Sequence, residues 1–321
     1  MRKLLLAACA ATSTIAGAAA RAGDDDALTR PIQLEVAAKW NAPQEPARVF
    51  GHTYYVGVAG LSAILIRTGQ GLILLDGDLP QSVPLIEANI AKLGLRVGDI
   101  KFILNSHAHY DHAGGIAALA RDSGATVVAS PSGAAALRAG HATPDDPQAG
   151  YVDPSRRDPA RFPPVTQPMR ELRDGDSVTL GDIVVTAHFT PGHTPGSTTW
   201  SWRDCEGERC LRIVYADSLN AVSAPGFHFL ADATHPDLTP RFRKSIQSVA
   251  ALPCDILLTV HPDLADIPAK LQRLRAGAES NPFVDPSACR RYAHEAETLL
   301  DARIAEEQAE RPSGRLRPAA R

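Results

Sequence analysis

Four side chains that can bind metal ions fall within six consecutive residues of this chain. Residues 107–112 read HAHYDH, which is the pattern H-x-H-x-D-H. Imidazole nitrogens are favoured ligands of Zn²⁺, and a carboxylate beside them helps to hold a second ion. So dense a set of ligands predicts a metal site rather than a chance cluster of histidines on a polar surface.

The flanking sequence predicts the elements that position these ligands. Residues 100–104 (IKFIL) have the β-branched and aromatic composition of a buried strand. Gly114-Gly115 then leads into an apolar run at 116–120 that is typical of a helix. We therefore expect the ligands on a loop at the carboxyl end of a strand, where α/β sheets place their binding sites.

Two more histidines follow predicted strands further along the chain. One lies in PGHTPGS at 191–197, after a strand at 183–189, and the other in VHP at 260–262, after a strand at 255–259. Either could simply cap its strand, but beside the first cluster both are predicted ligands. The six predicted ligands, which are also the predicted catalytic residues, form two sets: His107, His109 and His193 for a first zinc, and Asp111, His112 and His261 for a second.

Three protein ligands per ion leave an open position for water, as catalytic zinc sites do. The expected cofactor is therefore two Zn²⁺ per chain. Asp76 ends a predicted strand at 71–75 close to the motif. It either orients a ligand histidine or the loop backbone, or is an ordinary turn residue.

Strand-rich and helical segments occur twice along the chain, with a metal-rich loop in each half. Two sheets packed face to face, with helices outside, would account for this order. Strands are predicted at 53–58, 62–67, 71–75, 101–104, 126–129, 177–180, 183–189, 197–202, 211–215 and 255–259, and helices at 80–93, 132–139, 241–251 and 286–308. The seven prolines of residues 141–168 predict a long ordered loop beside the site, with a domain linker as the alternative.

Composition limits the partners. The net charge is −3 and the pI about 6.4, so no basic surface for nucleic acid is expected. Arg2 and Lys3, an apolar run at 4–11 and the small residues at 20–22 predict a signal peptide over residues 1–22 and a periplasmic protein. Residues 23–321 would then form one catalytic domain with a polar tail from about 309. A lipid anchor at Cys9 is the alternative, although only eight residues precede it.

No other stretch is long and apolar enough to cross a membrane. We expect the protein to be a monomer.

After removal of residues 1–22 four cysteines remain, and in an oxidising compartment they allow three pairings. Cys205 and Cys210 flank a polar turn that can close a hairpin, which favours Cys205–Cys210 and Cys254–Cys289. Four free buried thiols remain the alternative.

The motifs together resemble the metallo-β-lactamase superfamily, and within it the third subclass of zinc-dependent β-lactamases. HAHYDHAGG and GHTPG carry the wider resemblance. The narrower one rests on PGHTPGSTTWSW at 191–202, YADSL at 215–219, APGF at 224–227, LPCDILLTVHP at 252–262 and ACRRYA at 288–293. It covers about residues 40–305, and it implies an αβ/βα four-layer sandwich, a binuclear zinc site, a periplasmic location and the Cys254–Cys289 bridge.

The resemblance also implies residues that contact the substrate. Ser218 stands where a related subclass has a cysteine ligand, and its hydroxyl suits hydrogen bonding better than metal binding. Asn220 stands where other members often have a small hydroxyl residue that helps to hold the substrate carboxylate. Gln148 matches a glutamine that reaches the substrate carbonyl in some members.

The implied activity is hydrolysis of the amide of β-lactam antibiotics by a metal-bound hydroxide, without a covalent enzyme intermediate. The sequence contains no S-x-x-K motif, and this absence argues against a serine β-lactamase. The alternatives are a thioester or lactone hydrolase similar to glyoxalase II, in which Asp217 would bridge the metals, and a zinc-binding protein without turnover.

Overall fold

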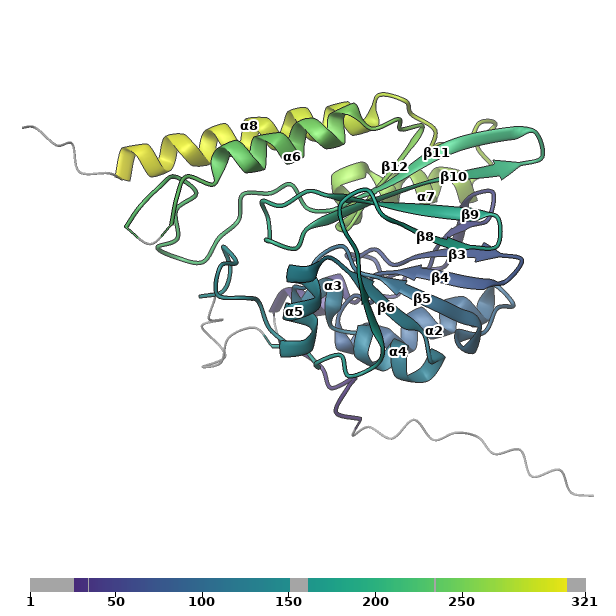
Figure 1. Cartoon of the computed structure of the whole chain (residues 1–321). Coiled ribbons are helices and arrows are strands. Elements are labelled where there is room, and N and C mark those ends of the chain that lie inside the picture. The colour runs from purple at the N-terminus through teal and green to yellow at the C-terminus, as the bar shows by residue number, and fades with distance from the viewer. Residues whose placement is uncertain (1–25, 34, 151–160, 234, 311–321) are drawn as a thin grey trace, which may run out of the picture.

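Two mixed β-sheets lie face to face at the centre of the structure, and helices cover their outer faces (Figure 1). This computed structural model describes residues 26–33, 35–150, 161–233 and 235–310. The predicted signal peptide, Cys9, the tail beyond residue 310 and the middle of the proline-rich loop, residues 151–160, lie outside the described residues.

The first sheet contains seven strands in chain order. Neighbouring strands are antiparallel from the first strand to the fourth and parallel from the fourth to the seventh, so the fourth strand has one neighbour of each kind. The strands are β1 (Ala47–Phe50), β2 (Thr53–Tyr55), β3 (Ile64–Thr68), β4 (Gly71–Leu75), β5 (Ile100–Leu104), β6 (Thr126–Ala129) and β7 (Met169–Glu171).

The second sheet contains five strands in the order β12-β11-β10-β9-β8. β11 and β12 are parallel, and the other neighbours are antiparallel. The strands are β8 (Ser177–Leu180), β9 (Ile183–Phe189), β10 (Thr198–Glu206), β11 (Arg209–Ala216) and β12 (Ile256–Thr259).

The apolar side chains of the strands point alternately to the two faces of each sheet, and this alternation creates the layers. On β4, Ile73 and Leu75 join the core between the sheets, whereas Leu72 and Leu74 face the helices on the other side. Because successive side chains of a strand point to opposite faces, a run that is apolar throughout must be covered on both. The helices α2 (Val83–Lys92), α4 (Ile116–Ser123) and α5 (Pro131–Ala139) cover the outer face of the first sheet.

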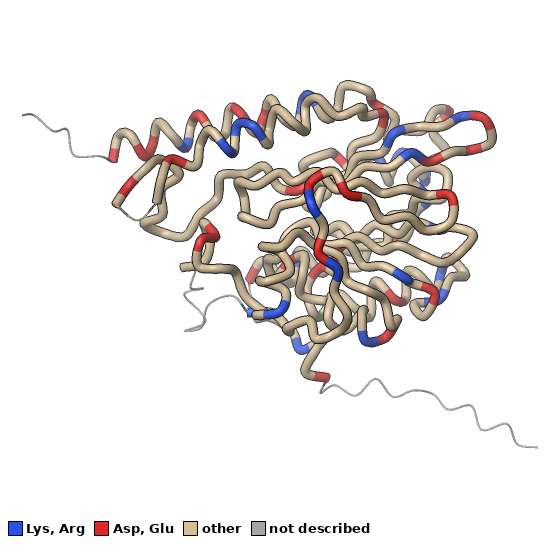
Figure 2. Tube along the Cα trace, in the orientation of Figure 1, with Lys and Arg blue, Asp and Glu red and all other residues tan. Residues whose placement is uncertain are grey.

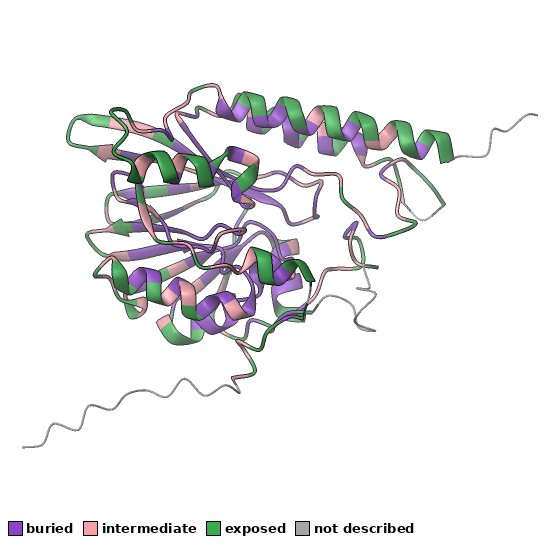
Figure 3. Cartoon of the chain, turned by 180° about the vertical axis from the view of Figure 1, so that it is seen from behind, coloured by how far each residue is buried: buried purple, intermediate pink, exposed green. Residues whose placement is uncertain are grey.

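The outer face of the second sheet is covered by α6 (Thr239–Ala251) and α8 (Ala288–Glu310), which pack along each other (Figures 1 and 3). Buried residues of α6 recur at helical spacing, as at Phe242, Ile246 and Val249. Charged residues lie mainly on the helices and at the strand tips (Figure 2). None of the helices that the structure describes is long and apolar enough to span a membrane.

The predicted four-layer sandwich is therefore confirmed. Strand and helix positions differ from the predictions mainly at their ends, but several short elements were not predicted at all. β1 and β7 are short, and α7 (Ile267–Arg275) buries only Ile267 and Leu271. The remaining short helices are α1 (Glu35–Trp40), α3 (Tyr110–Ala113), η1 (Pro80–Ser82), η2 (Val97–Asp99) and η3 (Pro262–Ala265).

Both predicted disulfides are present. Cys205 and Cys210 pair across the tip of the β10–β11 hairpin, five residues apart. Cys254 and Cys289, 35 residues apart, tie the segment before β12 to the first turn of α8. The second bridge therefore joins the strand that leads to His261 to the helix outside it.

We expect loss of the Cys254–Cys289 bridge to destabilise the protein more than loss of the hairpin bridge. The chain entropy removed from the unfolded state grows with the closed loop, which gives about 4 kcal/mol for the longer loop and about 2 kcal/mol for the shorter. Urea unfolding of the Cys254→Ala/Cys289→Ala and Cys205→Ala/Cys210→Ala variants measures both. Equal losses, or a larger loss at the hairpin, would contradict this order.

Candidate metal centre

The ligand loops meet at one edge of the sandwich. The H-x-H-x-D-H segment leaves β5, the His193 loop joins β9 to β10, and His261 follows β12. Two hydrogen bonds join the first two loops across the sheets: Thr198 N donates to Ser106 O at 2.8 Å, and Trp200 Nε1 donates to Asn105 O at 3.1 Å. The distances between ligands are therefore set by contacts between the two sheets.

The buried carboxylate of Asp76 holds the start of the motif loop. It accepts hydrogen bonds from Ser106 N at 2.7 Å, Ser106 Oγ at 2.6 Å and Tyr215 OH at 2.8 Å. Burial raises the pKa of this carboxyl to about 7. Of the roles considered for Asp76, the structure favours orientation of the loop backbone, and the Tyr215 contact adds a link to the second sheet.

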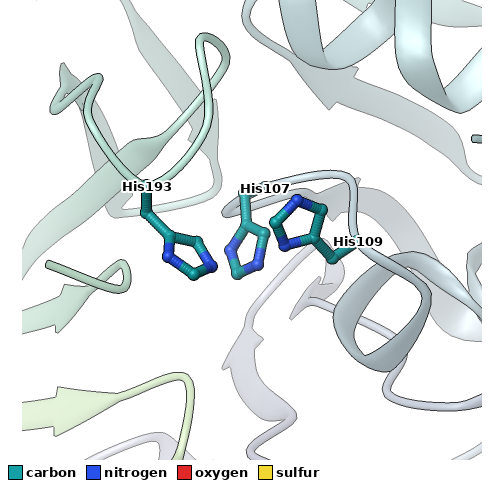
Figure 4. Close-up of side chains that lie close together, drawn as sticks. All are labelled: His107, His109 and His193. Carbon is teal, nitrogen blue, oxygen red and sulfur yellow. The ribbon is translucent and has the colours of Figure 1, made fainter. Parts of the chain in front are cut away.

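His107, His109 and His193 converge as a buried cluster (Figure 4). Each offers one ring nitrogen, and these nitrogens lie within 4.8 Å of one another. The ring centroids are 4.7–5.0 Å apart. The structure thus brings together the first set of predicted ligands.

The opposite nitrogen of each ring has a partner that fixes the orientation of the ring. His107 Nδ1 lies 2.6 Å from Asp217 Oδ1, and His193 Nδ1 donates to Asn220 O at 2.9 Å. His109 uses Nε2, which lies 3.2 Å from each carboxylate oxygen of Asp146. Metal-binding histidines are commonly held in this way, because the partner selects the tautomer and aims the free nitrogen.

The remaining predicted ligands form a second cluster. Asp111 Oδ2 lies 3.4 Å from His112 Nε2 and 3.4 Å from His261 Nε2, and the two Nε2 atoms are 3.3 Å apart. Ligands at about 2.0–2.1 Å from a tetrahedral zinc are themselves about 3.3–3.4 Å apart. These spacings fit a zinc ion.

The two clusters adjoin at His107. Its ring also groups with Asp111 and His112 within the same 4.8 Å limit, and its centroid lies 4.5 Å from that of His112. Nε2 of His107 is buried and has no hydrogen-bond partner among the described residues. An unpaired buried nitrogen is costly, and a metal ion in the first cluster would satisfy it.

The charge states suit metal binding at four of the six ligands. At the other two, His109 and His261, burial would lower the pKa, but Asp146 and Asp111 outweigh it and raise the pKa of each. Burial and the neighbouring rings lower the pKa of His193 to about 3 and hold the pKa values of His107 and His112 well below their usual range. Burial alone would raise the pKa of Asp111, but His112 and His261 outweigh it and keep this pKa well below its usual value. Neutral imidazoles next to an ionised carboxylate are the forms that coordinate metals.

The predicted substrate contacts lie around the first cluster. Gln148 Nε2 is 3.4 Å from His193 Nε2, and the backbone of Asn220 contacts the same ring. Ser218 is buried, and its hydroxyl accepts a hydrogen bond from Asn220 N at 3.4 Å. Gln148 therefore borders the cluster through its side chain and Asn220 through its backbone, whereas Ser218 is connected to it through Asn220.

Three residues at the site were not predicted. Asp146 contacts His109 from the proline-rich loop, and the Trp40 ring of α1 lies 5.4 Å from the ring of His261. Tyr292 of α8 donates to Asp217 O at 2.9 Å and accepts from Leu219 N at 3.1 Å, which holds the segment containing Ser218. Only Tyr292 had a sequence signal, in the ACRRYA segment of the resemblance.

Comparisons with known proteins agree with this geometry. Residues 56–206 match the model of the metallo-beta-lactamase superfamily. The solved structure of Rm3 metallo-beta-lactamase is 49% identical, with a TM-score of 0.81, and the alignment covers 86% of this chain and all of that one. MEM-A1, a subclass B3 metallo-beta-lactamase from a soil metagenome library, is 47% identical, with a TM-score of 0.79, over 84% of this chain and 99% of that one.

Curated relatives match a shorter region. Hydroxyacylglutathione hydrolases of Anaeromyxobacter dehalogenans and Gloeobacter violaceus are each 32% identical over 139 residues, or 43% of this chain. The match spans only 40% and 43% of those two proteins. The agreement with the solved structures extends over nearly the whole of their chains, and on that basis this protein belongs to the metallo-β-lactamase superfamily, with subclass B3 enzymes as its structural neighbours.

Proposed function

We propose that this protein is a zinc-dependent β-lactamase that hydrolyses the amide bond of β-lactam antibiotics. The observation that carries the proposal is the near-complete match to Rm3 metallo-beta-lactamase, which extends well beyond the metal motif. The spacing of the two ligand clusters supports the same conclusion, because it suits a pair of zinc ions.

In this proposal the clusters hold one zinc each. The first would be bound by His107, His109 and His193, and the second by Asp111, His112 and His261. Bound zinc would supply Lewis-acid polarisation of the lactam carbonyl and a water of lowered pKa. Six ligands on loops that directly follow buried strands provide the pre-organised site that such chemistry needs.

The residues of the chain would supply orientation and proton transfer. The carboxylate of Asp111, ionised in the site, can orient the attacking water, accept its proton and pass a proton to the departing lactam nitrogen. Asn220 and Ser218 would line the place of the substrate carboxylate, and the amide of Gln148 would reach the substrate carbonyl. The Gln148 side chain and the Asn220 backbone beside His193, and the contact of Ser218 with Asn220, support these roles.

A thioester hydrolase remains the second candidate, because the curated relatives carry that kind of name. It requires Asp217 to bridge the two metals. In the structure Asp217 Oδ1 instead lies 2.6 Å from His107 Nδ1, on the nitrogen opposite the one that faces the cluster. This contact supports a role for Asp217 in orienting His107.

We further propose export to the periplasm, with residues 1–22 as a cleaved signal and residues 23–321 as one catalytic domain that acts as a monomer. The two disulfides support an oxidising compartment.

The purified, zinc-loaded protein should hydrolyse a cephalosporin much faster than a thioester or a lactone. The assay measures kcat/KM for each substrate under the same conditions, with chelated protein as the blank. Rapid thioester turnover with no β-lactam hydrolysis would transfer the assignment to the second candidate. Turnover of none of the three would leave a zinc-binding protein.

Elemental analysis should find two zinc ions per chain in the wild type and one in His261→Ala. His261 supplies only the second cluster, so the first ion should stay and turnover should fall sharply. His294→Ala is the matched control, because His294 is exposed on α8. One zinc in the saturated wild type, or loss of both ions from His261→Ala in a folded protein, would contradict the two ligand sets.

Two variants separate the candidates by a different route. Asp217→Asn should keep both zinc ions, because the amide oxygen can still accept a hydrogen bond from His107. Asn220→Ala should raise KM for β-lactams more than it lowers kcat, because it removes carboxylate binding common to the ground and transition states. Loss of a zinc from Asp217→Asn, together with a silent Asn220→Ala, would favour the thioester hydrolase.

A further inference from the structure

A carboxylate from outside the metal motif enters the first cluster. Asp146 lies 37 residues after His109, in the short segment 143–149 that follows α5. Both of its side-chain oxygens lie 3.2 Å from His109 Nε2. The Asp146 side chain is only 4% exposed and that of His109 only 9%, so the pair is shielded from water.

This contact sets the tautomer of His109. A carboxylate only accepts hydrogen bonds, so Nε2 must carry the proton and Nδ1 must present its lone pair. His107 and His193 are arranged in the opposite sense, since their Nδ1 atoms have the outward partners. Asp146 therefore determines which nitrogen His109 offers to a metal.

The same residue organises its own segment. Asp146 Oδ1 accepts a hydrogen bond from Gln148 N at 2.7 Å, and Asp146 O accepts one from Ala149 N at 2.9 Å. Pro147 O accepts from Ala224 N at 2.9 Å, which connects this segment to the one that begins at Asn220. The contact with His109 thus also fixes where the side chain of Gln148 lies beside His193.

We propose that Asp146 is a positioning residue that couples zinc binding in the first cluster to the order of the 143–149 segment. The proposal rests on the metal ligation proposed above. Coupling between two such events is reciprocal: if Asp146 strengthens zinc binding through His109, then zinc must stabilise the segment through Asp146. Metal occupancy would then control the position of the Gln148 side chain as well as the chemistry of the site.

The first test measures zinc affinity by competition with a chelator. Asp146→Ala should weaken binding at the first cluster about 10- to 100-fold, the usual effect of removing the partner of a ligand histidine, and should leave the second cluster unchanged. Asp146→Asn should restore most of the affinity, because its amide oxygen can accept from His109 Nε2. Asp145→Ala, which removes a charge from an exposed neighbour, is the matched control.

The second test uses the wild type with and without zinc. Hydrogen exchange at the amides of Gln148 and Ala149 should slow when zinc is bound, and the slowing should be absent in Asp146→Ala. If zinc does not change the exchange rates of these amides in the wild type, the coupling is overturned, even if the variant fails to fold. Wild-type zinc affinity in a folded Asp146→Ala, or an equal loss in Asp145→Ala, would overturn the positioning role.

Neither readout needs a substrate, so the outcome is separable from the proposed function. Absence of β-lactam turnover, combined with weakened zinc binding in Asp146→Ala, would remove the function and keep the coupling. Normal β-lactam turnover with no effect of Asp146→Ala on zinc would do the reverse.

Discussion

The site depends on one buried carboxylate that lies between the sheets. Asp76 directly follows β4, and it accepts two hydrogen bonds from Ser106 and one from Tyr215 of the second sheet. The backbone angle φ of Asp76 is +60°, a strained value for a residue other than glycine. Strain at a position that three donors hold in place is characteristic of functional sites. Together with the hydrogen bonds from Thr198 and Trp200 of β10, this contact connects the loop that carries four of the six ligands to the sheet that carries the other two.

A second constraint is the partner on the far side of each histidine. The first cluster contains three imidazoles, and a separate group orients each of them: Asp217, Asp146 and the backbone of Asn220. Asp146 follows α5, whereas Asp217 and Asn220 lie three residues apart in the segment that follows β11. The ring orientations therefore require the whole sandwich to be assembled, and side-chain disorder near the metals would require several contacts to break together.

The elements that could be predicted are those whose apolar residues recur with the period of a strand or a helix. All strands except β1 and β7 were predicted, because alternating or continuous apolar runs such as Gly71–Leu75 are buried on one or both faces. β7 was not, since Met169–Glu171 has no buried residue and forms only because its backbone pairs with the edge of β6. α1 is too short to show a helical period. α7 does carry Ile267, Leu271 and Leu274 at helical spacing, so the sequence held a signal for this helix that the prediction missed.

The site shows the same division. Four ligands share one loop and two follow predicted strands, so their types and spacing were sufficient to find them. Asp146 was missed because its position depends on how the proline-rich loop folds, which no periodic pattern encodes. Trp40 was missed because its contact with His261 is between residues more than 200 positions apart in the chain. Contacts of this kind arise from tertiary packing alone.

The parallel pairing of β12 with β11 has a consequence for the order in which the clusters can form. A chain that emerges from the ribosome N-terminus first presents His107, His109 and then His193, so the first cluster has all its ligands once β9 and the loop after it have been made. His261 follows β12, so it is synthesised later than the ligands of the first cluster. β12 pairs with β11, and the disulfide between Cys254 and Cys289 connects the segment before β12 to α8. Prematurely terminated chains that lack the last third of the sequence would therefore retain one set of ligands but not the other, and the second cluster would be complete only in a chain whose two sheets had both finished folding.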